Sequence, residues 1–227
     1  MALTTLLLLP GLSLSAVPSV PLWDKAVRIS GPVKEWVPGN ASFRLEMVDD
    51  KGAVQESWQM WYQLSRSPTG DVAMEVIRAM HNNEDTTRKE QQAQRKRKAI
   101  PFTMGDNPFD PQVQDAVAVT PRGEKDTVAG RECALFDFIL KKKEGAVVRG
   151  TAWLDAQTGA PVQVSYTATP LPRGVFKLTT TIRYAPGPAG EGFLKDVHVE
   201  GVGGILFFRK SFRSDISVDE YWRRGSS

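Results

Sequence analysis

The residues of this chain that could support nucleophilic, acid–base or metal chemistry are few. There is one cysteine, Cys133, and there are two histidines, His81 and His198. A single thiol excludes an intrachain disulfide framework and any zinc site that needs several thiolates. Cys133 stands inside a strand-like segment with Arg131 as its only cationic neighbour in sequence. That setting is typical of a buried, inert cysteine rather than of a nucleophile.

His198 lies in a stretch where Asp196, His198 and Glu200 alternate with valines, so the three would share one face of a strand. Such a set could coordinate a metal ion or form part of an enzyme site. An outward strand face has the same composition, however, and no further ligand accompanies the three. We therefore predict no catalytic residue, no metal and no cofactor, and interpret the protein as non-enzymatic.

One glycine cluster, residues 201–204, precedes the apolar run 205–208. A phosphate-binding loop needs a helix after its glycines, whereas this run is typical of a strand. The cluster is therefore interpreted as a bulge or a tight hairpin. Walker, HExxH and GxSxG motifs are missing from the sequence as well.

The elements that would position these residues are predicted to be mainly β. Apolar and polar residues alternate with period two, which is typical of half-buried strands, and turn residues separate the runs at hairpin spacing. We expect a mainly β (α+β) protein with a large curved antiparallel sheet or half-open β-barrel and one or two helices as lid or excursion. The predicted strands are 43–47, 54–64, 72–80, 132–140, 147–154, 162–169, 175–184, 193–200 and 205–216.

The composition is that of an ordinary globular protein: 41% of the 227 residues are hydrophobic and 24% are charged. The 29 basic and 26 acidic residues give a net charge of +3, which does not indicate a nucleic-acid-binding protein. No repeat or linker divides the chain, so we expect a single domain over residues 17–227.

Residues 1–16 form a short apolar stretch that ends in small residues, which predicts a secretory signal peptide. The stretch is too short for a membrane-spanning helix. No basic residue precedes it, so a plain hydrophobic terminus is the alternative.

Several predicted strands carry large apolar side chains on both faces, which is typical of a curved sheet around an apolar cavity. A barrel completely filled by its aromatic side chains is the alternative. The residues predicted to line a ligand site are Trp58, Met60, Tyr62, Phe136, Phe138 and Trp153.

Residues 82–98 are polar and favour a helix, yet they have no apolar stripe. They are either a solvated excursion from the sheet or an electrostatic patch for an anionic partner. The basic residues of this patch are Arg88, Lys89, Arg95, Lys96, Arg97 and Lys98.

The following loop, residues 100–111, is rich in turn residues and carries Phe102, Met104 and Phe109. Such a loop could lay these side chains over an open edge or cavity as a lid. Simple anchoring of the loop by the same side chains is the alternative.

A stretch of about forty residues, Val128 to Thr167, resembles a known family. It contains a Gly130-Arg131 strand start, then Trp153-Leu154-Asp155, and then Thr158-Gly159 with Pro161-Val162. This pattern resembles the LolA/LolB-like superfamily of bacterial periplasmic lipoprotein carriers, and the chain would be a distant member.

That resemblance implies a half-open antiparallel barrel with a helical lid, which binds acyl chains in its apolar concavity. It further implies an exported, periplasmic bacterial protein that holds a lipid or lipoprotein acyl chain, with a role in sorting outer-membrane lipoproteins. The alternative is a cell-envelope interaction or scaffold protein whose basic segment 88–98 binds an acidic envelope protein or an anionic membrane surface.

Overall fold

The computed structural model describes residues 20–66, 72–96, 106–143, 145–187, 190–205 and 208–223. The predicted signal peptide lies outside the described residues. So do Phe102 and Met104 of the predicted lid, and Arg97 and Lys98 of the basic segment.

Most of the described chain forms one antiparallel sheet of eleven strands, in the order β5-β4-β3-β2-β12-β11-β10-β9-β8-β7-β6. The two ends of this order, β5 and β6, do not pair with each other, so the sheet is not closed into a barrel. The predicted fold class is confirmed. The strands are β2 (Asn40–Val48), β3 (Val54–Arg66), β4 (Val72–His81), β5 (Glu84–Asp85), β6 (Val117–Val128), β7 (Arg131–Lys141), β8 (Val147–Asp155), β9 (Pro161–Thr169), β10 (Val175–Pro186), β11 (Gly192–Ile205) and β12 (Phe208–Asp219).

The sheet is built from two runs of sequential hairpins. Strands β2 to β5 form one run and β6 to β12 form the other, and the pairing of β12 with β2 joins them. Strand β6 was not predicted, because Pro121, Gly123 and a series of charged residues interrupt its alternation and its register with β7 shifts between Pro121 and Lys125. Strands β1 (Trp36–Val37) and β13 (Trp222–Arg223) form a separate two-stranded sheet.

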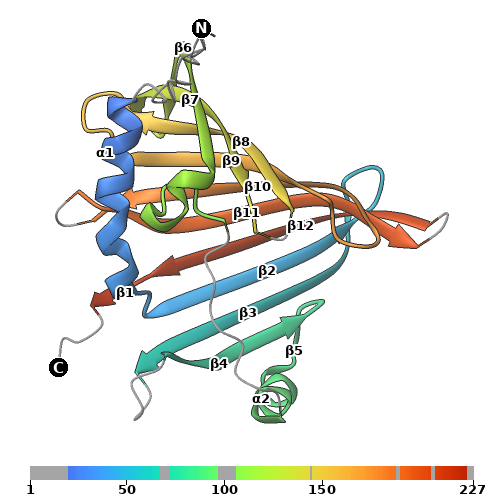
Figure 1. Ribbon diagram of the computed structural model, residues 1–227. Helices are drawn as coiled ribbons and strands as arrows, with labels where there is room; N and C mark the ends of the chain where they lie inside the picture. Colours follow the sequence, from blue (N-terminus) through green and yellow to red (C-terminus); the bar gives the residue numbers. More distant parts are fainter. Residues whose placement is uncertain are drawn as a thin grey trace, which may run out of the picture.

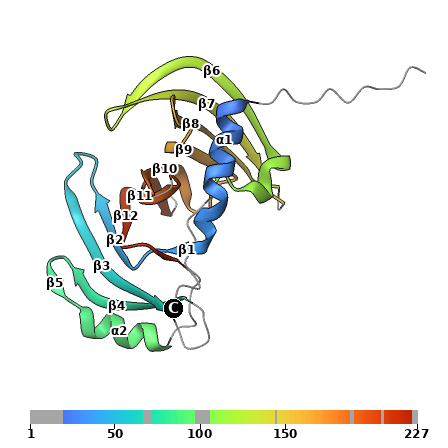
Figure 2. The ribbon, with the colours of Figure 1, turned by 90° about the vertical axis from the view of Figure 1, so that its left-hand side faces the viewer.

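The large sheet curves around helix α1 (Pro21–Ser30), which lies within the curve and crosses the strands near one end (Figures 1 and 2). Helix α1 continues into the 3-10 helix η1 (Gly31–Glu35). A second 3-10 helix, η2 (Pro111–Ala116), precedes β6. Within the described residues, no helix is long and apolar enough to span a bilayer.

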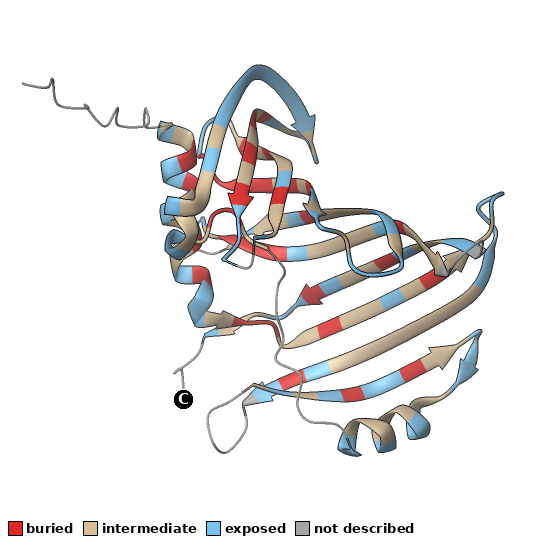
Figure 3. Ribbon diagram, turned by 45° about the vertical axis from the view of Figure 1, so that its right-hand side comes forward, coloured by how far each residue is buried: buried red, intermediate tan, exposed pale blue. Residues whose placement is uncertain are grey.

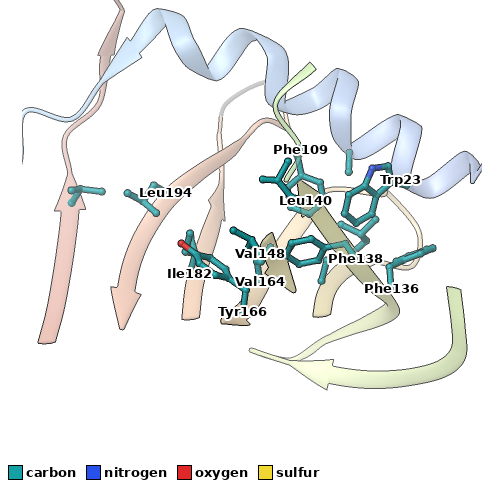
Figure 4. Close-up of a cluster of buried hydrophobic side chains, with 14 of the residues drawn as sticks. Trp23, Phe109, Phe136, Phe138, Leu140, Val148, Val164, Tyr166, Ile182 and Leu194 are labelled. Carbon is teal, nitrogen blue, oxygen red and sulfur yellow. The ribbon is translucent and has the colours of Figure 1, made fainter. Parts of the chain in front are cut away.

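The main core lies between α1 and the concave face of the sheet (Figure 4). Trp23 of α1 packs against Phe109, with 4.8 Å between ring centroids, and lies 6.1 Å from both Phe136 and Phe138 of β7. Buried aliphatic side chains of β8, β9 and β10 continue the core, among them Val148, Val164 and Ile182.

Helix α2 (Thr87–Lys96) lies along β4, at the edge of the sheet away from β6 (Figures 1 and 2). It has no buried residue, and Figure 3 shows that its residues are exposed or half-buried. The helix predicted within residues 82–98 is confirmed, but it begins later, at Thr87.

Candidate functional site

Strand register decides which side chains share the concave face with the core. Residues paired across an antiparallel ladder point to the same side of a sheet. Ala41 of β2, a core residue, pairs with Tyr62 of β3 and with Val218 of β12. Every second residue along these three strands therefore belongs to the concave face.

Helix α1 covers only one end of this face. On β2, β3 and β12, the buried apolar residues of the concave face are Ala41, Leu64 and Val218, near the end where α1 crosses (Figure 1). Toward the other end of the same strands, most concave side chains are apolar and only half-buried. Ser214 of β12, opposite Leu45, is a buried polar exception. The half-buried apolar side chains there belong neither to the core cluster nor to the residues packed against it.

We call this set the open apolar face. Its members are Phe43, Leu45, Met47, Trp58, Met60 and Phe212. Cross-strand pairing holds them together, since Phe43 is opposite Met60 and Leu45 is opposite Trp58. Among the described helices, α1 crosses these strands near their other end and α2 lies beyond β4 (Figure 1).

Polar side chains of the concave face gather at the far end of the open apolar face. His81 of β4 stacks on Trp58, with 4.9 Å between ring centroids and 9° between the ring planes. A ring nitrogen of His81, Nε2, lies 3.1 Å from Oε1 of Glu56. Register also places Lys210 of β12 at this end, opposite Gly203. The face is therefore mainly apolar, with Ser214 opposite Leu45, and is charged at its rim.

The structure brings together three of the six residues predicted to line a ligand site. Trp58 and Met60 belong to the open apolar face, and Tyr62 follows them on the same side of β3, where its hydroxyl lies 3.1 Å from Sδ of Met60. These three connect the open apolar face to the core, because Tyr62 packs against the core cluster.

The other three predicted lining residues lie elsewhere. Phe136 and Phe138 share the concave face but are buried under α1, with 4% and 2% exposure. Trp153 alternates with the buried Ala152 and Leu154, so it points to the opposite face, where its indole Nε1 donates a hydrogen bond of 2.9 Å to Asp126. Sequence alternation separates the faces of one strand but does not relate faces between strands.

Phe109, the described residue of the predicted lid, is fully buried between Trp23 and Tyr184. This placement corresponds to loop anchoring, the alternative that the sequence left open. Four members of the open apolar face were not selected from the sequence: Phe43, Leu45, Met47 and Phe212. The alternation in 43–47 was visible there, but only the register with β3 reveals that it faces Trp58 and Met60.

The convex face of the central strands is polar, and several of its charges form ion pairs within or between strands. Glu46, only 2% exposed, lies between the guanidinium groups of Arg44 and Arg213. His198 Nδ1 lies 2.7 Å from Oδ1 of Asp215, and Asp196 pairs with Arg183 at 3.5 Å. Among the described residues, no three histidine, cysteine or acidic side chains are grouped as metal ligands.

The titratable groups around the core are held in their neutral forms. Burial raises the pKa of Tyr166, which lies on the concave face opposite Gly150. Burial also raises the pKa of Tyr184, with a further contribution from Tyr166. Uncharged phenol groups therefore border the core on this side, and the chemistry that the concave face offers is apolar contact.

No family model matches the chain, and no curated protein matches it either. Solved structures of similar fold include a LolA superfamily protein from Nitrosomonas europaea, with 10% identity, a TM-score of 0.41, and coverage of 93% of this chain and 96% of that chain. An outer membrane lipoprotein-sorting protein domain from Vibrio parahaemolyticus has 11% identity, a TM-score of 0.37, and coverage of 83% and 87%.

The MucA/MucB complex of Pseudomonas aeruginosa is a further similar structure, with 10% identity, a TM-score of 0.27, and coverage of 91% of this chain and 99% of that chain.

Proposed function

We propose that this protein is an exported, non-enzymatic binding protein that holds a lipid or lipoprotein acyl chain on the open apolar face. One observation carries the proposal. Six half-buried apolar side chains lie together on the concave side of the sheet, outside the core and away from the end where α1 crosses.

An acyl chain suits this face for a physical reason. Moving a methylene group out of water is favourable by about 0.8 kcal/mol, and the gain depends on the apolar area covered rather than on directed bonds. Met47 and Met60 add flexible side chains, which adapt to a chain of variable shape. A partly exposed apolar surface of this kind in a folded protein commonly marks a ligand site or an interface.

The polar rim favours an amphiphile over a plain hydrocarbon. Glu56, His81 and Lys210 stand where the open apolar face ends. An acyl chain lying along Met60 and Trp58 would therefore have its polar headgroup beside charged side chains and water. The opposite orientation would bring the headgroup toward Tyr62 and the buried core.

The cellular role that we propose follows the sequence resemblance. Residues 1–16 would direct the chain to the bacterial periplasm, and residues 17–227 would form the single half-barrel domain. Transfer of an acyl chain in outer-membrane lipoprotein sorting fits both the periplasmic location and the half-barrel domain, and it requires no catalytic residue.

The test uses two neighbouring residues of β3 that point to opposite faces. Met60 lies on the open apolar face, while Gln59 faces the convex side, opposite Arg44. Purified protein is titrated with cis-parinaric acid, a fluorescent fatty acid, in the absence of vesicles. We expect saturable binding that Met60→Asp weakens at least about tenfold, which is about 1.4 kcal/mol, because the variant sets a carboxylate against the chain.

The control variant Gln59→Asp should bind the probe within about twofold of the wild type, a change of well under 1 kcal/mol. Circular dichroism and thermal unfolding establish that both variants fold. The proposal is wrong if the wild type shows no saturable binding, or if the two variants weaken binding equally. If the wild type binds the probe as expected, native mass spectrometry of protein from the envelope fraction, followed by lipid analysis, identifies the natural amphiphile.

A further inference from the structure

Helix α2 is held to the sheet by polar side chains that complete the hydrogen bonding of an edge strand. The side-chain amide of Gln94 accepts from the Val76 amide at 3.0 Å and donates to the Met74 carbonyl at 2.6 Å. Gln91 donates to the Val76 carbonyl at 2.8 Å, and the Thr87 hydroxyl accepts from the Ala79 amide at 3.0 Å.

Thr87, Gln91 and Gln94 are spaced by four and three residues, so they form one stripe along the helix. This stripe replaces the apolar stripe by which surface helices usually attach to a core. It also fixes the rotation of α2 about its axis, because the stripe has to face the backbone of β4. The opposite side of the helix therefore has a defined direction, away from the sheet.

The basic residues of α2 lie away from the stripe. Lys89 and Lys96 are opposite it, and Arg88 and Arg95 are on one flank of the helix, about 90° away. Arg88, Lys89, Arg95 and Lys96 are all exposed, and Glu90 is the only acidic residue of the helix. Within the described residues, none of these four basic side chains forms an ion pair. By contrast, Arg44, Arg183 and Arg213 of the sheet are all paired with carboxylates. The helix thus presents four positive charges outside any ion pair of the described residues, with Glu90 as the one opposing charge on α2.

Apolar and aromatic side chains accompany these charges on the adjoining strands. Ile77 of β4 is 51% exposed, and it directly follows Val76, whose backbone binds Gln91 and Gln94. Next to it, Arg78 holds its guanidinium 5.2 Å from the ring centroid of Trp61. Arg78 and Trp61 point to the convex face of these strands. Basic residues together with an exposed aliphatic residue are typical of a surface that binds lipid headgroups.

We propose that the basic side of α2, together with Ile77, docks the protein on the surface of an anionic phospholipid bilayer. Lys and Arg side chains near such a surface are attracted to its anionic headgroups, and four of them support reversible attachment at moderate ionic strength. Attachment of this kind is weakened by salt, since the attraction falls off within a Debye length of about 10 Å at 0.1 M.

Choosing a bilayer over an acidic protein rests partly on the proposed function, because an acyl chain is collected from or delivered to a membrane. The fold supports the connection, because β4 is paired with β3, which carries Trp58 and Met60 of the open apolar face. A bilayer against α2 would lie along the edge of the sheet next to that face.

The experiment is flotation of the purified full chain with vesicles of phosphatidylcholine alone, or with 30% phosphatidylglycerol. We expect binding only to the anionic vesicles, and its loss at high salt. Reversing Arg88, Lys89, Arg95 and Lys96 to glutamate should weaken binding at least about tenfold. Because acidic residues near a helix C-terminus are unfavourable, a second variant replaces the same four residues with glutamine and should show the same loss.

A matched control reverses four exposed basic residues elsewhere, Lys51, Arg149, Arg173 and Lys195, and changes the net charge by the same amount. This control should retain vesicle binding within about threefold, since the attraction is local. Equal loss in both reversals, or no binding of the wild type to anionic vesicles, overturns the proposal. If the wild type does not bind anionic vesicles but is retained on immobilised polyglutamate, the surface binds an acidic protein instead.

The two proposals fail separately. Met60→Asp should lose cis-parinaric acid but still float with anionic vesicles. The α2 variants should lose flotation but still bind the fatty acid in solution. If the protein floats normally with anionic vesicles but binds no fatty acid, the proposed docking surface is supported and the proposed acyl-chain binding is wrong.

Discussion

The indole ring of Trp23 rests on the ring of Phe109, which joins helix α1 to the segment before η2 over the concave face of the sheet. The indole Nε1 also donates a hydrogen bond of 3.1 Å to the Gln114 side chain in η2. These contacts attach both segments to Phe136 and Phe138 of β7, far from either in sequence. The position of α1, and hence the extent of the open apolar face, depends on this aromatic cluster.

Replacing Trp23 with alanine should therefore destabilise the protein by about 3–5 kcal/mol, the usual cost of removing a buried aromatic side chain. Urea unfolding followed by circular dichroism measures the change. The control is Trp58→Ala, which removes a half-buried ring from the open apolar face and should cost clearly less while weakening fatty acid binding. Equal costs for the two variants would contradict the assignment of Trp23 to the core.

Gly150 should tolerate no side chain, because the neighbouring strand β9 and the ring of Phe138 occupy the space beside it. A Cβ atom there would lie 2.2 Å from the Ser165 carbonyl oxygen and 2.9 Å from Cε1 of Phe138. Gly150→Ala should cost about 1–3 kcal/mol in unfolding free energy. In the control, Gly31→Ala, the nearest atom would be 3.6 Å away, and the change should be near zero or slightly stabilising. A harmless Gly150→Ala would mean that the β8–β9 ladder relaxes freely.

Cys133 should react slowly with thiol reagents in the folded protein. Its side chain is fully buried, and burial raises the pKa of its thiol, so little thiolate forms near neutral pH. We expect the reaction with Ellman's reagent at pH 8 to be on the order of 100-fold slower than in denaturant. Ser217→Cys in a Cys133→Ser background supplies an exposed thiol on β12 for comparison. Similar native rates for the two thiols would show that β7 opens readily.

The sequence predicted most strands correctly because their alternation is local. Residues 43–47, 54–64 and 72–80 correspond to β2, β3 and β4 in their predicted meander. The predicted turn after β8 is also confirmed, with Gly159 at a φ of 71° and its amide bonded to the Asp155 carbonyl. Local patterns of this kind need no knowledge of the partner strand.

The candidate site was less predictable, because it depends on contacts between distant segments. Pairing of β12 with β2 brings Phe212 opposite Met47, and no local sequence pattern predicts that contact. The role of α1 could have been inferred from Trp23, Ala26 and Ser30, whose spacing of three and four residues marks its buried side. The attachment of helix α2 to the sheet could not be predicted, because the helix has no apolar stripe. Gln91 and Gln94 bind backbone groups of β4 instead.

Gln94→Ala should expose the Val76 amide, because the Gln94 side chain is the acceptor for that group. We expect faster hydrogen exchange at Val76 and its neighbours in β4, with little change in the central strand β9. The control Gln92→Ala alters an exposed side chain of the same helix and should leave β4 unchanged. Equal exchange in the two variants would mean that the glutamine stripe does not hold α2 in solution.

Asp155 should make a contribution to stability that depends on pH. Its Oδ1 accepts hydrogen bonds from the amides of Thr158 at 2.7 Å and Gln157 at 3.0 Å. Burial alone would raise the pKa of this carboxyl, but the bonds from Thr158 and Gln157 outweigh it and hold the pKa below its ordinary value of 3.8. The folded state therefore prefers the ionised carboxylate, and the stabilisation is complete above the unfolded pKa and is lost as pH falls through the folded pKa.

Asp155→Ala should cost about 1 kcal/mol at pH 6, and the difference from the wild type should narrow as the pH is lowered below 3.8. Urea unfolding at pH 6 and pH 3 measures both, with Asp50→Ala in an exposed turn as the control. A difference that stays constant between the two pH values would show that the carboxylate's charge does not stabilise this turn.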